Sequence, residues 1–124
     1  MSYFFNFDKM KYVKGPRPNG CILCLIREKS EQVEDLTVYG DELFTVSVNL
    51  YPYNPGHVMI FPNRHLEDVR KFTEQEEQRM NRLTRMFLDV LERTHQPSAF
   101  NIGYNMGSSA GASIDHLHLH IIPR

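Results

Sequence analysis

The chain has 124 residues, which is enough for one domain with its own hydrophobic core. Its 41% hydrophobic and 23% charged residues are typical of a globular protein, and a formal net charge of −1 argues against the basic surface that nucleic acids and membranes attract. No apolar run reaches the length of a membrane span, and the first residues, MSYFFNFDKMKYVKG, lack the regions of a signal peptide. We therefore expect a single cytoplasmic domain over residues 1–124, without a nucleic-acid or membrane partner.

The predicted elements of the first half are short. Residues 1–20 contain two glycines and two prolines and predict an irregular arm, whereas CILCLIREKS, residues 21–30, predicts a short helix. Residues 36–50, LTVYGDELFTVSVNL, predict two strands around a glycine–aspartate turn, because Val, Thr and aromatic residues dominate them. The prolines of YPYNPG, residues 51–56, indicate a loop, and the alternation of HVMIFP, residues 57–62, predicts a third strand.

The second half contains the one long predicted helix, residues 73–95. Thr73 and Glu76 have the spacing of a capping box at its start. The helix then carries an apolar stripe that predicts packing on the core: Met80, Leu83, Phe87, Val90 and Leu91. SAFNIGYN, residues 98–105, alternates as a strand, and the small residues of MGSSAGASID, 106–115, predict a loop. Together the elements predict an α+β domain on a mostly antiparallel five-stranded sheet, with one long and one short helix.

HLHLHIIPR, residues 116–124, places three of the six histidines at every second position. This alternation is the period of a strand, so the three rings are expected on one face, about 7 Å from one to the next. The histidines could lie on the surface by chance, could share one catalytic zinc, or could divide the work between a nucleophile and neighbours that orient it, stabilise charge or bind metal. The regular alternation disfavours chance, and a backbone separation of roughly 13–14 Å between the outer two disfavours one shared ion.

The loop before the histidines favours the division of roles. Residues 105–113, NMGSSAGAS, combine glycines with serine hydroxyls. Glycines let backbone N–H groups approach a ligand closely, and several such donors together with hydroxyls suit phosphate oxygens. The sequence therefore predicts a phosphate-binding loop that leads directly into the histidine strand.

These motifs resemble the histidine triad (HIT) superfamily of nucleotide hydrolases and transferases. The similar segments are HLHLHII, CILC, NLYPYNPGHVMIFPNRH and NMGSSAGASIDHLHLHIIPR, which extend in family order from about residue 20 to the end. The segments KYVKG, GCILC and NLYPYNPGH look most like the bacterial branch that phosphorolyses or hydrolyses dinucleoside polyphosphates such as diadenosine tetraphosphate. The resemblance implies a HIT-like fold and a homodimer in which the helix over residues 73–95 makes the contact. Relatives usually continue past the triad with a tail that helps to form the leaving-group side of the site, whereas this chain stops at Arg124.

The resemblance also implies a role for each residue of the site. His118, the middle histidine, matches the nucleophile that attacks the α-phosphorus of a nucleotide, and water or phosphate then resolves the nucleotidyl-histidine intermediate. His120 and His57 match histidines that contact the phosphate and its developing charge. The implied nucleotide-binding residues are Asn49 for the ribose, Asn105, Gly111 and Ser113 for the phosphates, and Ile22, Leu23 and Ile26 for the base.

Cys21 and Cys24 are the only cysteines, and in a reducing compartment a C-x-x-C pair indicates half of a metal site or a redox pair. They could also be small buried residues of a short helix. A redox pair would need a thioredoxin-like βαβ setting, which the sequence lacks. In zinc-containing HIT proteins the partners of the C-x-x-C pair correspond to His65 and His116, so the resemblance implies a structural zinc bound by these four side chains.

Two other functions would use the same residues. One is hydrolysis of nucleoside phosphoramidates through the same His118 intermediate, and the other is a nucleotide-binding module without catalysis. The presence of the nucleophile together with its histidine neighbours favours an enzyme over a binding module.

Overall fold

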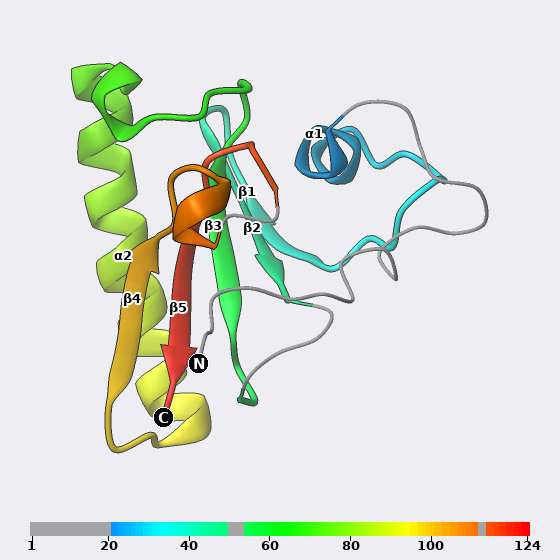
Figure 1. Ribbon diagram of the computed structural model, residues 1–124. Helices are drawn as coiled ribbons and strands as arrows, with labels where there is room; N and C mark the ends of the chain where they lie inside the picture. The colour runs from blue at the N-terminus through cyan, green and yellow to red at the C-terminus, as the bar shows by residue number, and fades with distance from the viewer. Residues whose placement is uncertain (1–20, 50–53, 112–113) are drawn as a thin grey trace.

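The computed structural model describes residues 21–49, 54–111 and 114–124, which form an antiparallel sheet with two α-helices (Figure 1). The strands are β1 (Thr37–Gly40), β2 (Phe44–Val48), β3 (Val58–Pro62), β4 (Phe100–Tyr104) and β5 (Leu119–Pro123), in the sheet order β1-β2-β3-β5-β4. The helices are α1 (Ile22–Arg27) and α2 (Glu74–His95), with 3₁₀ turns at Val69–Lys71 and Ser108–Ala110. The predicted α+β class and its five strands are confirmed.

Three stretches covered by the sequence-based prediction lie outside the described residues. They are the arm over residues 1–20, residues 50–53 at the end of the second predicted strand and in the loop after it, and residues 112–113 of the phosphate-binding loop, which include Ser113. Among the described residues, no helix has the length and apolarity that crossing a membrane requires.

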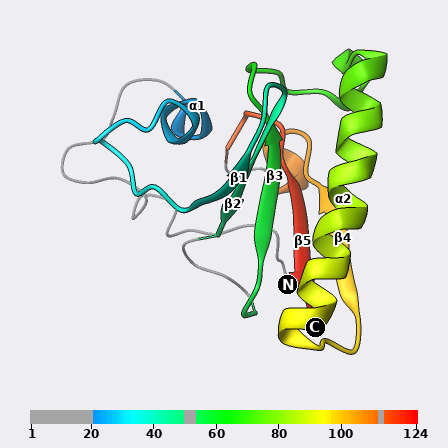
Figure 2. The same ribbon diagram turned by 180° about the vertical axis from the view of Figure 1, so that it is seen from behind.

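The start of α2 agrees with the sequence because the predicted capping box forms. Thr73 Oγ1 accepts the N–H of Glu76 at 3.1 Å, and Glu76 Oε1 accepts the N–H of Thr73 at 2.8 Å. These bonds satisfy two of the N–H groups that a helix start leaves open. Met80, Leu83 and Leu91 are buried against the sheet, so α2 covers one of its faces (Figures 1 and 2). The prediction that Val90 joins this stripe is wrong, since its side chain is 43% exposed.

Alternation along β3 gives the sheet two apolar faces. Val58 and Ile60 belong to the cluster that packs on α2, whereas Met59 and Phe61 pack with Leu23 of α1. The helix α1 therefore lies on the face opposite to α2. Because Met59 stands directly opposite His120 in the β3–β5 pairing, the His120 ring emerges on the α1 side.

The histidine segment differs from the expected continuous strand. β5 begins only at Leu119, so His120 lies on it, whereas His116 and His118 precede it. The β3–β5 pairing ends at Ile60 and Leu119, and the residues before Leu119 have other partners: the His116 ring donates to the Pro62 carbonyl, and the Leu117 N–H donates to the Leu66 carbonyl. The expectation that β5 lies inside the sheet beside β3 is confirmed.

Candidate functional site

The His118 ring is held in one orientation by its neighbour's backbone. Its Nδ1 lies 2.8 Å from the carbonyl oxygen of His116, and since a carbonyl only accepts, Nδ1 carries the proton. The other nitrogen, Nε2, then carries a lone pair. The ring is 4% exposed, and burial lowers the pKa of His118 because it disfavours the charged form. A neutral imidazole with a fixed tautomer is what nucleophilic attack requires.

His120 lies next to His118, and His57 lies next to His120. The ring of His120 lies 4.8 Å from that of His118 between centroids, and its Nδ1 lies 2.9 Å from His57 Nε2. Asn49 Nδ2 lies 3.4 Å from the same His57 nitrogen. Burial lowers the pKa of His57 to about 4 and that of His120 to about 2, and the Arg124 cation lowers the pKa of His57 further. Both rings are therefore neutral near pH 7.

We expect acid to destabilise the fold through these buried rings. Because the folded pKa of His57, about 4, lies below the ordinary value of about 6.5, the unfolded chain binds a proton between these values and the folded chain does not. The neutral His57 ring thus contributes fully to the free energy of unfolding above pH 6.5. This contribution, about 3 kcal/mol, is lost as the pH falls from 6.5 toward 4.

Urea unfolding between about pH 7.5 and 4.5 measures this loss. His57→Gln is expected to show a shallower fall than wild type, whereas His95→Gln, a change at an exposed histidine at the end of α2, is expected to follow wild type. Equal slopes for His57→Gln and wild type would contradict the assignment.

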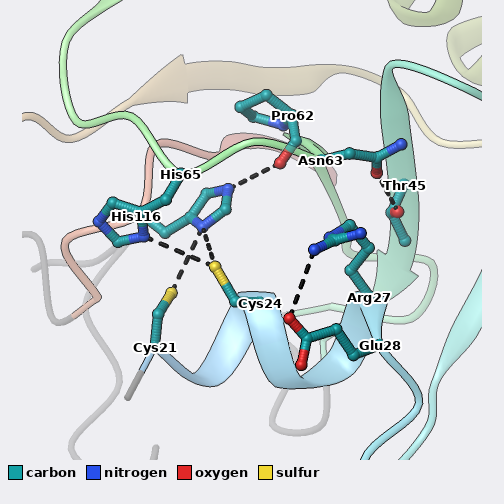
Figure 3. Close-up of polar contacts among 9 residues, drawn as sticks. All are labelled: Cys21, Cys24, Arg27, Glu28, Thr45, Pro62, Asn63, His65 and His116. Atoms are coloured by element: carbon teal, nitrogen blue, oxygen red, sulfur yellow. Dashed lines mark hydrogen bonds and ion pairs between the residues drawn. The ribbon is translucent and has the colours of Figure 1, made fainter.

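A second cluster includes His116, whose carbonyl bonds to His118, and Figure 3 shows its four residues converging from three parts of the chain. The ligand atoms of Cys21, Cys24, His65 and His116 all lie within 4.8 Å of one another. His116 Nδ1 is 3.3 Å from one sulfur and 3.4 Å from the other, and His65 Nδ1 is 3.6 Å from Cys24 Sγ. Sulfur and nitrogen ligands of a tetrahedral zinc lie about 3.6 Å apart, so the four side chains could hold such an ion.

In both histidines, Nε2 bonds to a group outside the cluster, so Nδ1 is the nitrogen that faces the other ligand atoms. His116 Nε2 lies 2.7 Å from the Pro62 oxygen and donates to it, which leaves the Nδ1 lone pair for a metal. His65 Nε2 lies 3.2 Å from a carboxylate oxygen of Glu67, the usual outer partner of a ligating histidine. Both cysteines are free, and burial together with Cys21 raises the pKa of Cys24 to about 11, so a metal would have to displace its proton.

The profile of the HIT domain matches residues 29–124, more than half of the chain. The chain belongs to the HIT domain family. It is 39% identical over 92 residues to an AP-4-A phosphorylase of Mycobacterium tuberculosis, which covers 73% of this chain and 47% of that protein. It is 37% identical over 86 residues to an asymmetrical bis(5'-nucleosyl)-tetraphosphatase of Schizosaccharomyces pombe, and the match covers 69% of this chain and 47% of that protein. This HIT domain thus spans about half the length of these curated relatives.

Solved structures agree with the family. A member of the HIT family from Bacillus subtilis superposes with a TM-score of 0.79 at 28% identity, covering 86% of this chain and 74% of that one. The expected HIT-like fold is confirmed.

The other predicted residues of this HIT domain that the structure describes lie on α1 and on the segment that follows β4. Asn105 is half-buried after β4, and Gly111 has a φ of 97°, which glycine adopts at little cost. All three apolar residues belong to α1: Ile22 is partly buried, whereas Leu23 and Ile26 are 0% and 1% exposed and pack against Met59 and Phe61 of β3. The contacts of these side chains with a nucleotide remain predictions.

Sequence reasoning missed the partners that hold the HIT histidines in place. The most important are backbone carbonyls, those of Pro62 and His116, and a carbonyl has no residue-type signature. It also missed the ion pair between Arg64 and the buried Glu76. The only available signal was position, because Arg64 directly precedes the candidate ligand His65.

Proposed function

We propose that this HIT domain carries the catalytic residues of an enzyme that cleaves dinucleoside polyphosphates through a nucleotidyl-His118 intermediate. The observation that carries the proposal is the 2.8 Å contact of His118 Nδ1 with the His116 carbonyl, which leaves Nε2 as a neutral nucleophile. Nε2 attacks the α-phosphorus, forming a P–N bond as the P–O bond to the leaving polyphosphate breaks. Water or phosphate then attacks and breaks the P–N bond. The relatives named AP-4-A phosphorylase and asymmetrical bis(5'-nucleosyl)-tetraphosphatase support this substrate class.

The neighbours of His118 are assigned to binding and charge stabilisation in this proposal. In this proposal His57 donates its Nε2–H to His120 Nδ1 across their 2.9 Å contact, and His120 donates its remaining N–H to a phosphate oxygen. Asn49 beside them binds the ribose. The phosphates are bound by Asn105, Gly111 and Ser113, and the base by Ile22, Leu23 and Ile26.

A product assay separates the proposed function from its two alternatives. The full chain is incubated with diadenosine tetraphosphate or adenosine phosphoramidate, each with and without inorganic phosphate. ADP formed only with phosphate indicates a phosphorylase, and AMP plus ATP without phosphate indicates a hydrolase. Faster cleavage of the phosphoramidate would favour the second enzyme reading, and binding without products would favour a nucleotide-binding module.

We expect His120→Ala to lower kcat by about 10²–10³-fold, the usual cost of removing one hydrogen-bond donor to developing charge. The ring lies on β5 within 4.8 Å of the nucleophile's ring and bonds to His57, so its loss affects both phosphate binding and rate. Steady-state kinetics measure this, with His95→Ala as the control at an exposed histidine. A His120→Ala enzyme with wild-type kcat would exclude this role.

We further propose that the cluster of Cys21, Cys24, His65 and His116 binds a structural zinc. Two sulfurs and two histidine nitrogens are a ligand set that zinc prefers, and both histidines have the outer partners that such a site uses. When bound, the ion would cross-link α1, the loop after β3 and the segment before β5. Because thiols without disulfides persist in reducing compartments, the two free cysteines also support the proposed cytoplasmic location.

A homodimer through α2 is proposed on the basis of exposed apolar side chains. Met86 and Val90 of α2 are 40% and 43% exposed, and Ile102 of the edge strand β4 is 46% exposed. α2 and β4 lie side by side in both views (Figures 1 and 2). Covering such residues in a second copy is favourable. Sedimentation at micromolar concentration tests the proposal, and a monomer would contradict it.

A further inference from the structure

The nucleophile lies outside the hydrogen-bond ladder of the sheet. The pairings of β5 with β3 and with β4 both end at Leu119, one residue after His118. The position of His118 therefore depends on how the segment before β5 is anchored rather than on the sheet alone.

The anchor of that segment is the chain just after β3. Leu117 donates its N–H to the Leu66 carbonyl at 2.8 Å, and the His116 ring donates to the Pro62 carbonyl at 2.7 Å. Between these two bonds, His116 Nδ1 points at the sulfurs of the metal cluster. Residues 62–66, which we call the anchoring segment, thus bond to the His116 ring through Pro62 (Figure 3) and to the next residue, Leu117, through Leu66.

The anchoring segment is itself fixed to two other elements. Arg64 binds both carboxylate oxygens of Glu76 on α2, at 2.8 and 2.9 Å, and donates to the Lys71 carbonyl at 2.7 Å. Asn63 accepts the Thr45 hydroxyl of β2 at 2.7 Å. Glu76 is 3% exposed, so this ion pair is largely shielded on the carboxylate side.

We propose that a metal in the cluster, together with the anchoring segment, positions the nucleophile, with His116 as the link. This inference rests on the proposed metal and proposed reaction. His116 contributes its side chain to the cluster and its carbonyl oxygen to His118 Nδ1, so one residue joins the two sites. A metal bond to the ring restrains the backbone of His116 and hence that oxygen. When the restraint is lost, the oxygen moves away from Nδ1 and the proton redistributes between the two ring nitrogens of His118.

The direct test compares the metal-free and zinc-reloaded full chain by nitrogen-15 NMR of the imidazole rings. At about pH 8.5 an ordinary histidine is neutral, so the spectrum reports tautomers. The loaded protein is expected to show a single His118 tautomer with the proton on Nδ1, and the metal-free protein a mixture of both. A single unchanged tautomer in a folded metal-free chain would overturn the proposal.

A pair of matched variants tests the proposal without removing a ligand. Arg64→Lys keeps the charge beside Glu76 but loses the two-pronged contact, and Arg70→Lys makes the same change in the exposed Arg70–Asp68 pair. With zinc in excess, Arg64→Lys is expected to lower kcat by about tenfold, at the lower end of outer-partner effects, with KM changed by less than about twofold. Its NMR spectrum is expected to show the mixed His118 tautomers, whereas Arg70→Lys matches wild type in both respects.

These variants decide the question if the metal-free chain unfolds. Wild-type kcat and a single His118 tautomer in Arg64→Lys would overturn the proposal. The NMR signal does not depend on turnover. A wild-type chain that cleaves no dinucleotide would therefore contradict the proposed function, but the effect of the metal on the His118 tautomer could still be measured.

Discussion

His118→Ala is expected to lower turnover by at least about 10⁴-fold, the scale of loss that follows removal of a catalytic nucleophile. Its tautomer is fixed by a backbone carbonyl at 2.8 Å and burial keeps its ring neutral. His116 shares both features, but its second ring nitrogen faces the cysteine sulfurs of the metal cluster. Nucleotide binding is expected to persist, because the proposed phosphate and ribose contacts come from His120 and Asn49. The loss should therefore appear in kcat rather than in the dissociation constant.

A denaturing quench measures the intermediate directly. When wild-type chain is mixed with labelled diadenosine tetraphosphate, the quench should trap the label on the protein, whereas His118→Ala should trap none. The trapped label should be acid-labile, because phosphorus–nitrogen bonds are acid-labile. His95→Ala, changed at an exposed histidine at the end of α2, is the control that should trap the wild-type amount. Equal trapping on His118→Ala, or turnover within tenfold of wild type, would show that another group is the nucleophile.

The parts of this fold that depend on local pattern could be predicted from the sequence. The start of α2 is one example, because Thr73 and Glu76 interact over three residues and need no tertiary contact. The strands are another, since alternation along β3 sorts Val58 from Met59 onto the two faces. The exposure of Val90 could not be predicted, because helical spacing gives the direction of a side chain and not the width of the sheet beneath it.

In the candidate site, the side chains could be predicted from the sequence, whereas the backbone groups that hold them could not. The histidines and cysteines are visible as residue types at regular spacing, and the structure brings the four candidate metal ligands within 4.8 Å of one another. The end of β5 at Leu119 could not be predicted, because alternation continues unbroken to His116. Just before β5 the His116 ring donates to the Pro62 carbonyl, 54 residues away in the chain, and only the folded chain reveals such a contact.

Cys21→Ser is expected to lower the free energy of unfolding by at least about 3 kcal/mol, because the binding free energy of a structural zinc is folding free energy and reaches about 10–16 kcal/mol in small zinc domains. A serine hydroxyl is a poor zinc ligand, so the variant keeps only three of the four groups that converge here. The effect should exceed that of losing packing, since Cys21 is only half-buried.

A chelator provides the control that separates metal loss from any other effect of the substitution. Urea unfolding of wild type with a strong chelator should approach the stability of Cys21→Ser, whereas the chelator should change Cys21→Ser little, since the two perturbations remove the same ion. Metal analysis of the purified chain should give one zinc per wild-type molecule and less for the variant. Turnover per folded molecule should fall by about 10–100-fold, which is a smaller change in free energy than the loss of stability. The effect is smaller because the variant disturbs His118 only through His116. A wild-type chain that contains no zinc, or whose stability does not respond to the chelator, would show that these four side chains pack together without a metal.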